Sequence, residues 1–216
     1  MDLIEEIIDV ENWDRRGLFT GFLDTTTCYT VLVDCTSIYK LARSRSLPFL
    51  PVLLHALLDG VNSVSPFRVR VIDGGTVVRY SVIDIVTTEM STDGKPYPMF
   101  VGYRPKVEDF VADYRERQAI TRPPREKGDP RAAHINTLRV SVLPGIFFTS
   151  VPCHDDPPAR RGAMFMNVGA RTKDACGRVM VPMGVTFAHS LLMGVDFTRL
   201  ARYVSYDYAR KQQHQD

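Results

Sequence analysis

A histidine where two sequence patterns meet is a first candidate for chemistry. The run Val179 to Phe187 is rich in β-branched and aromatic residues, which predicts a strand, and Pro182 within it favours an edge or a bulge. After this run the period changes, so that His189 and Asp196 fall on one face of a predicted helix. An imidazole at such a junction can project into a cleft and exchange a proton with a hydroxyl or thiol near neutral pH. The alternative is a hydrogen-bonded histidine at a helix end.

A serine is the second candidate. Ser150 closes the run from Phe147 to Ser150, at the end of a predicted strand. A hydroxyl there can donate to a developing oxyanion, and one good donor stabilises a transition state by roughly 3 kcal/mol. The alternative is a turn serine that bonds its own backbone.

The remaining histidines offer weaker sites. His55 and Asp59 match the pattern H-x-x-x-D-G one helical turn apart and could pair on the surface, but the apolar residues around them indicate a packing helix. His134, and His154 with the two aspartates after it, lack the spacing of metal ligands. We therefore predict no metal, and no glycine-rich pattern indicates nucleotide-phosphate chemistry.

Composition excludes several classes of protein. The 216 residues are 44% apolar and 24% charged with a net charge of +2, and the arginines are dispersed, so no nucleic-acid partner is predicted. No apolar run approaches the roughly 18 residues of a membrane span, and the first ten residues are acidic rather than signal-like. The four cysteines lack C-x-x-C spacing, which predicts free thiols in a reducing cytoplasm. They are Cys28, Cys35, Cys153 and Cys176.

The elements that must position these residues mix strands and helices, without a repeat or a linker. Predicted strands cover 28–36, 67–71, 76–87, 99–103, 138–151, 164–171 and 179–187. Predicted helices cover 37–45, 49–62, 106–119 and 191–211, and Asn12 is expected to cap a short first helix or turn. Asp73-Gly74-Gly75 between two β-rich runs predicts a hairpin. The arrangement predicts an α+β fold in a single domain over 1–216.

Four short motifs occur in order along the chain. They are Trp13 to Phe19 for W-x-R-x-x-x-F, Asn62 with 67–70 for N-x-x-x-x-[FL]-R-x-[RA], 143–150 for L-P-W-x-x-F-[TD]-S, and 181–194 for P-x-x-x-x-H-H-x-x-x-D-G. Each motif is weak alone, but the co-linear set resembles the trimeric chloramphenicol acetyltransferase family over nearly the whole chain.

That resemblance implies transfer of an acetyl group from acetyl-CoA to a hydroxyl in a ternary complex, without an acyl-enzyme. It implies that His189 is the general base and Ser150 the oxyanion stabiliser, with Cys28 and Phe100 lining the substrate pocket. It also implies a two-layer sandwich with a mixed β-sheet and a homotrimer with active sites between subunits.

Three positions depart from the family pattern. Ala188, Met193 and Gly145 stand where the family has its first histidine, its aspartate and its tryptophan. In the family that aspartate pairs with the arginine matching Arg15, and an unpaired buried charge strongly destabilises a protein. Asp196, one turn further on, is the predicted substitute.

Two main hypotheses follow from the resemblance and its departures. The first is an acetyl-CoA-dependent O-acetyltransferase that acetylates chloramphenicol or a related small hydroxyl compound. The alternative is a catalytically weakened member that binds a CoA ester or a small hydrophobic ligand without efficient turnover. Transfer to a thiol or amine acceptor is a third reading.

Overall fold

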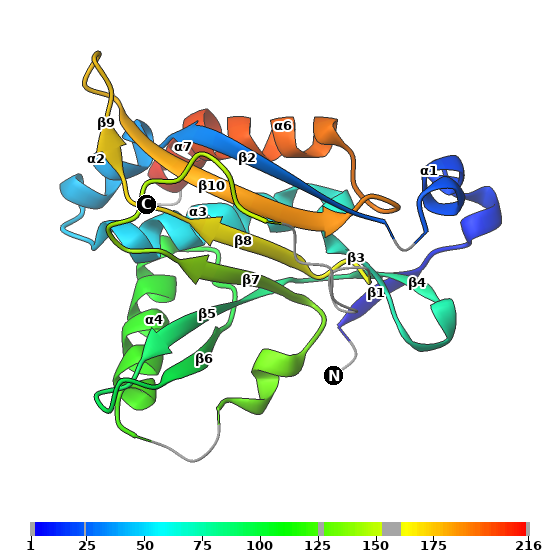
Figure 1. The fold of residues 1–216 in the computed structure, drawn as a ribbon, viewed down its shortest axis with the longest axis horizontal. Helices are drawn as coiled ribbons and strands as arrows, with labels where there is room; N and C mark the ends of the chain where they lie inside the picture. The colour runs from blue at the N-terminus through cyan, green and yellow to red at the C-terminus, as the bar shows by residue number, and fades with distance from the viewer. Residues whose placement is uncertain (1–2, 24, 125–127, 153–160, 215–216) are drawn as a thin grey trace.

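The chain folds around a mixed seven-stranded sheet that carries helices on one face (Figure 1). The computed structural model describes residues 3–23, 25–124, 128–152 and 161–214. Strand order is β2-β10-β8-β7-β5-β6, with β9 pairing to β10; the β5–β7 and β7–β8 pairs are parallel and the others antiparallel. The strands are β2 Thr26–Asp34, β5 Asp84–Met90, β6 Pro96–Val101, β7 Thr137–Val142, β8 Met164–Val168, β9 Thr172–Lys173 and β10 Val179–Ala188.

The helices lie behind the sheet in Figure 1, around the long apolar helix α3. They are α2 Thr36–Ser44, α3 Phe49–Ser63, α4 Val107–Thr121, α6 Gly194–Arg202 and α7 Tyr208–Gln213, with a π-helical turn η5 Tyr203–Asp207 between the last two. In α3 every residue from Pro51 to Val61 is buried, because the helix packs against α2, α4, α6 and α7. All ten residues of β10 are buried as well, so this strand is covered on both faces.

A smaller three-stranded sheet, β1-β4-β3, completes the fold. Its strands are β1 Ile4–Ile7, β3 Val69–Val71 and β4 Val77–Tyr80. The predicted hairpin is confirmed, because β3 and β4 pair across the turn, in which Gly74 and Gly75 have φ values of 76° and 80°. The predicted strand 76–87 is instead two strands, β4 and β5, in different sheets.

Short helical segments complete the list. They are α1 Arg16–Gly21 and the 3-10 segments η1 Val10–Asn12, η2 Ser65–Arg68, η3 Asp73–Gly75 and η4 Pro130–Ala133. The predicted cap at Asn12 is wrong, because Asn12 ends η1 and Arg15 precedes α1.

Helices α2, α3 and α4 confirm the predicted helices at 37–45, 49–62 and 106–119. The strand predicted to continue to Val151 is wrong beyond Val142, where β7 ends and an irregular segment 143–152 begins. Pro144 has no backbone N–H to donate, and Gly145 has a φ of 79°, so neither residue continues a strand.

His55 and Asp59 do not pair on the surface, as the pattern allowed; both side chains are fully buried in α3. His55 Nδ1 lies 2.6 Å from the hydroxyl of Tyr208, and its Nε2 lies 2.7 Å from the carbonyl of Arg104. Asp59 accepts hydrogen bonds from two tyrosine hydroxyls and the Lys211 ammonium. Burial lowers the pKa of His55. The packing-helix interpretation is confirmed, since both side chains join α3 to the C-terminal helices.

The cysteines differ from expectation at one described position. Cys35 is buried and Cys176 is exposed, and both are free thiols. Cys28 is disulfide-bonded, so the prediction of a free thiol is wrong there. Cys153 and His154 lie outside the described residues.

Candidate active site

His189 follows the last residue of β10 directly. Its backbone N–H donates to the carbonyl of Thr25 at 2.8 Å, which extends the pairing of β10 with β2 by one bond. The residues after it form a turn, and α6 begins only at Gly194. The helix predicted over 191–211 is confirmed as α6, η5 and α7, but it starts later than expected and His189 lies outside it. The histidine is therefore held by a strand end and a tight turn, half-buried at the end of the sheet.

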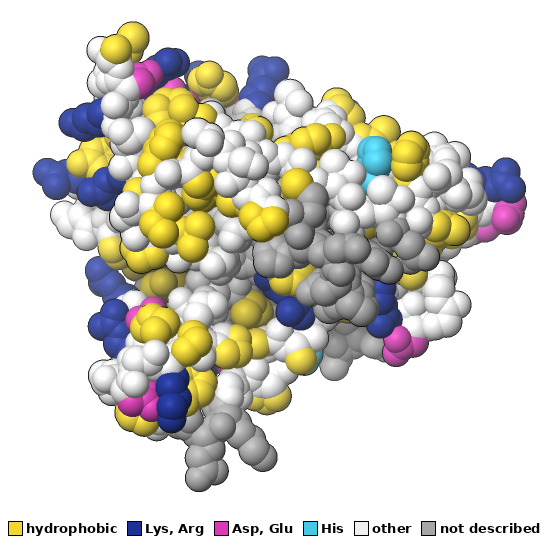
Figure 2. Space-filling view, in the orientation of Figure 1, with side chains coloured by type: hydrophobic (Ala, Val, Ile, Leu, Met, Phe, Trp, Pro, Cys, Tyr) yellow, Lys and Arg dark blue, Asp and Glu magenta, His cyan; other side chains and the backbone are white. Residues whose placement is uncertain are grey.

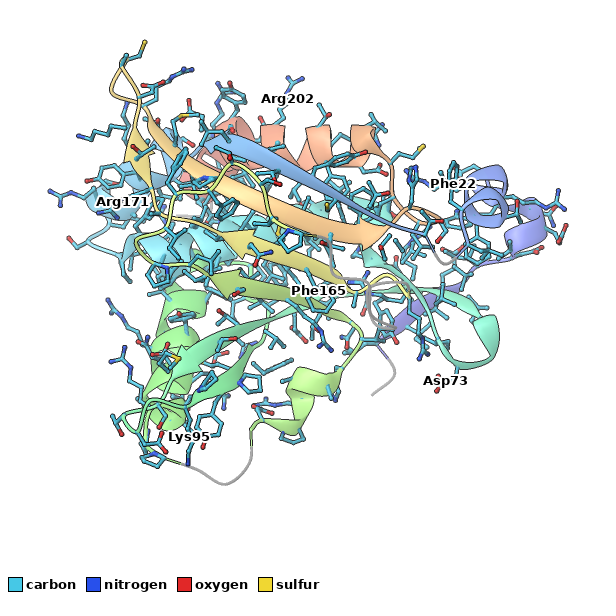
Figure 3. The ribbon with its side chains drawn as sticks, viewed as in Figure 1. Phe22, Asp73, Lys95, Phe165, Arg171 and Arg202 are labelled. Carbon is cyan, nitrogen blue, oxygen red and sulfur yellow. The ribbon has the colours of Figure 1, made fainter. Side chains whose placement is uncertain are left out.

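The imidazole of His189 is held in one orientation by the turn that follows it. Its Nδ1 lies 3.2 Å from the carbonyl oxygen of Leu192. Because a carbonyl can only accept, Nδ1 must carry a proton, and in the neutral ring the lone pair is then on Nε2. The ring packs against Phe22, with centroids 4.4 Å apart, and edge-on to Phe187. Figure 3 labels Phe22 at this end of the molecule, and Figure 2 shows histidine atoms at the surface there. A ring with this tautomer can remove a proton from a substrate.

Arg15 and Asp196 form a two-bond ion pair beside this turn. Arg15 Nη1 lies 2.7 Å from Asp196 Oδ2, and Nη2 lies 2.9 Å from Oδ1. The Asp196 side chain is 0% exposed and that of Arg15 is 12% exposed. Arg15 thus has a carboxylate partner although Met193 occupies the expected aspartate position. Arg199, at 3.7 Å, is a second and exposed neighbour of Asp196.

The same pair braces the turn that carries the histidine's hydrogen-bond acceptor. Asp196 Oδ2 accepts from the backbone N–H of Met193 at 2.9 Å, and Arg15 donates to the carbonyl of Leu191 at 3.0 Å. Burial raises the pKa of Asp196, but the hydrogen bonds from Arg15 and Met193 outweigh it and leave the pKa below its usual 3.8. The carboxylate is therefore charged at neutral pH. Together, Arg15 and Asp196 link the start of α1 to the backbone of Leu191 and Met193, the residues on either side of Leu192.

The opposite face of the sheet, toward the viewer in Figure 1, carries a row of side chains across four strands. Cys28 pairs with Thr186, Thr186 with Phe165, and Phe165 with Arg139. Because Tyr29 on β2 packs with Phe187 and Phe197 on the helical side, Cys28 and its row must point away from the helices. We call this side the open face.

Ser150 lies on the irregular segment that crosses the open face. The neighbouring Val151 packs so closely over Gly184 that a Cβ on the glycine would lie 2.0 Å from Val151 Cγ2. The carbonyl of Val151 is 4.0 Å from Cys28 Sγ. Ser150 itself is exposed. The segment therefore places the serine above β10 and β2, close to Cys28.

A single chain does not bring His189 and Ser150 together. Gly184, under Val151, is five residues before His189, which is about 16 Å along a strand. The ring of His189 also packs edge-on to Phe187, on the helical side, whereas the segment of Ser150 lies on the open face. Sequence spacing alone could not show this separation.

Phe100 continues the row of Cys28 beyond Arg139. It pairs with Val86, which pairs with Arg139, so about five strand spacings, roughly 24 Å, separate it from Cys28. Phe100 is 7% exposed, and the Arg131 guanidinium lies 4.5 Å above its ring. The structure thus places Cys28 and Phe100 on one face, but not in one pocket of a single chain.

Arg139 and Phe165 also lie in this row, although no local sequence pattern singles them out. Both fall in predicted strands, but only the register between strands aligns them with Cys28.

A cavity of about 800 Å³ lies elsewhere, on the helical side between β2 and α6–η5, and neither His189 nor Ser150 lines it. Within the described ranges, no three His, Cys, Asp or Glu side chains gather as a metal site. No helix among the same residues is long and apolar enough to span a membrane.

A family model described as Chloramphenicol acetyltransferase matches residues 4–204. The chain belongs to the chloramphenicol acetyltransferase family. Among curated relatives, the enzyme named chloramphenicol acetyltransferase from Proteus mirabilis is 23% identical over 205 residues, covering 90% of each chain. That of Clostridium perfringens is 20% identical over 201 residues, covering 89% of this chain and 90% of the relative.

Solved structures give the same family and a wider fold group. A structure named chloramphenicol acetyltransferase has a TM-score of 0.81 and 25% identity, and covers 93% of this chain and 97% of its own. A dihydrolipoamide acetyltransferase from Azotobacter vinelandii has a TM-score of 0.67 at 14% identity, covers 97% of this chain and 92% of its own, and shares the fold alone. The predicted α+β class and the resemblance are confirmed, and the chain is an acyltransferase of the chloramphenicol acetyltransferase family.

Proposed function

We propose that this family member is an acetyl-CoA-dependent O-acetyltransferase that acts on chloramphenicol or a related small hydroxyl compound. The observation that carries the proposal is the imidazole of His189, which is half-buried and whose Nδ1 is committed to the Leu192 carbonyl. An Nε2 with a free lone pair is the form a general base needs. We further propose that the protein acts as one domain over 1–216, as a homotrimer in the cytoplasm, without a metal.

In the proposed reaction, His189 Nε2 removes the proton of the acceptor hydroxyl as its oxygen attacks the thioester carbonyl of acetyl-CoA. The tetrahedral intermediate places a negative charge on the former carbonyl oxygen, to which the Ser150 hydroxyl donates. Collapse breaks the carbon–sulfur bond, and the imidazolium returns its proton to the CoA thiolate. The products are the acetyl ester and free CoA, and His189 is neutral again.

Two chains are needed to assemble this site, because His189 and Ser150 lie apart within one. Apolar side chains are exposed around the segment of Ser150 and on the nearby strand β2: Leu32 is 51%, Ile146 53% and Phe147 50% exposed. Exposed apolar groups of this kind mark interaction surfaces. His189 of one protomer would then meet Ser150 of its neighbour, and Cys28 would line the acceptor site. The contact of Phe100 with substrate stays a prediction.

Free-thiol release from acetyl-CoA, followed with and without chloramphenicol, tests the proposal. We expect His189→Ala to lower transfer by several orders of magnitude, because general-base help and orientation are both lost. His214→Ala, an exposed histidine near the C-terminus, is the control and should keep full activity. Equal rates in wild type and His189→Ala would contradict the proposal.

Met193 motivates the second hypothesis, a weakened member that binds a CoA ester or a small hydrophobic ligand. The ion pair of Arg15 with Asp196 argues against it, because the arginine has not lost its carboxylate partner. Acetyl-CoA binding without thiol release, across a panel of hydroxyl acceptors, would favour the binding protein instead.

A further inference from the structure

Arg139 stands in the middle of the open face as an arginine that lacks an ion pair in the described parts of the chain. Its Nε is buried and has no hydrogen-bond partner. Two other arginines have a buried unpartnered Nε, Arg68 and Arg79, but these pair with Glu5 and Glu6 through their Nη1 atoms. Arg139 therefore differs from both in having no carboxylate partner among the described residues.

Among the described residues, the neighbours of Arg139 in its row offer no acceptor to its guanidinium. The guanidinium carbon lies 5.4 Å from the centroid of the Phe165 ring, which Figure 3 labels at the centre of the sheet. An aromatic face attracts the flat side of a guanidinium but accepts nothing in the plane of its N–H groups. The paired positions in the same row, Thr186, Phe165 and Val86, carry no acid.

The position of Arg139 relates it to the acceptor site. Arg139 lies three strand spacings from Cys28, and the Phe165 ring that its guanidinium approaches lies two strand spacings, roughly 10 Å, from Cys28. Val151 and Ser150 lie beside Cys28. A small aromatic alcohol spans such a distance. The planar fork of an arginine matches a carboxylate in two parallel hydrogen bonds.

We propose that Arg139 and Phe165 form an anion-binding subsite that selects a hydroxyl acceptor bearing a carboxylate. The inference rests on the proposed function and narrows its substrate class. The guanidinium of Arg139 binds the carboxylate of the acceptor. A neutral acceptor such as chloramphenicol leaves the Arg139 donors unsatisfied and is the poorer substrate.

The test compares two probes, 4-(hydroxymethyl)benzoate and its neutral methyl ester, by calorimetric binding to the full chain without acetyl-CoA. Arg139→Met keeps an aliphatic side chain over Phe165 and removes the charge. We expect it to weaken binding of the acid about 10- to 100-fold and to leave binding of the ester unchanged. Arg202→Met, on α6 and away from the open face in Figure 3, is the matched control and should bind both probes as wild type does.

Stability and turnover provide independent readouts. Arg139→Met should change the Tm little, because the described residues offer Arg139 no ion pair to lose and the methionine side chain can still pack on Phe165. The value of kcat/KM should fall only for the acid. Equal binding of acid and ester by wild type, or equal loss of both in the variant, overturns the subsite. If Arg139→Met raises only the KM for acetyl-CoA, the acceptor subsite is also overturned, because Arg139 then binds an anionic group of the co-substrate. Arg139-dependent binding of the acid without thiol release supports the subsite while refuting the proposed function.

Discussion

Replacing Asp196 by asparagine tests whether the ion pair with Arg15 supports the turn that holds His189. The substitution keeps the shape of the side chain and one oxygen that can accept from the Met193 N–H. It removes the charge opposite Arg15, whose two bonds to Asp196 are 2.7 and 2.9 Å long. Any change in Tm or turnover therefore reports the loss of the charge rather than the loss of the hydrogen bond to the Met193 N–H.

The cost follows from the burial of the two groups. Removing one partner of a buried ion pair costs about 3–5 kcal/mol. Asp196 is 0% exposed, but Arg15 is 12% exposed and keeps its bond to the Leu191 carbonyl, so we expect the lower end, about 3 kcal/mol. For a chain of 216 residues, each 1 kcal/mol shifts the Tm by about 2–4 °C, and the expected loss is thus about 6–12 °C.

Thermal unfolding and acetyl transfer at 25 °C are measured on the same samples. Arg199→Ala is the matched control, because it removes an exposed partner of Asp196 and should cost less than about 1 kcal/mol. Arg15→Met combined with Asp196→Asn should regain part of the Tm, since no unpaired charge remains. We also expect turnover to fall in Asp196→Asn, because the Leu192 carbonyl loses its support. A Tm and a rate matching those of Arg199→Ala would refute the reasoning.

Two further predictions follow from the same region of the structure. The pKa of Asp196 is lowered in the folded protein, so its stabilisation is present above the unfolded value of about 4 and is lost as the pH falls through the folded pKa. The Tm difference between wild type and Asp196→Asn should therefore be constant above about pH 5 and shrink below about pH 4, as calorimetry can measure. Gly184→Ala would place a Cβ 2.0 Å from Val151 and displace the segment of Ser150, so we expect slower acetyl transfer. Val151→Ala in the same chain should restore the rate; no loss in Gly184→Ala would contradict the close packing.

The sequence was sufficient for elements that one strong local pattern defines. Helix α3 is apolar almost throughout and was predicted within one or two residues. Strand β1 was missed because its sequence, Ile4 to Ile7, has two central glutamates. In the fold these are Glu5 and Glu6, which pair with Arg68 and Arg79 from more than 60 positions away. Such long-range ion pairs leave no trace in local periodicity.

The site was predictable in its residue types but not in its assembly. His189, Arg15 and Asp196 were named from the order of motifs, and the structure shows the ion pair between the last two. The proton on Nδ1 of His189 is fixed by the backbone carbonyl of Leu192. The position of a backbone carbonyl cannot be read from the types of the side chains. Arg139 became visible only through strand register, because four separate segments contribute to its row.

The place of Asp196 explains how the chain can lack the family's aspartate at position 193 and keep its architecture. Because α6 begins at Gly194, Asp196 is the third residue of the helix, where a carboxylate can reach back to the N–H before the helix. From the same position the carboxylate oxygens of Asp196 reach Arg15. The partial positive charge at the N-terminus of α6 also stabilises the negative charge of Asp196. In this chain the buried carboxylate that pairs with Arg15 comes from Asp196, one helical turn after position 193. Met193 alone is therefore no reason to expect an inactive protein.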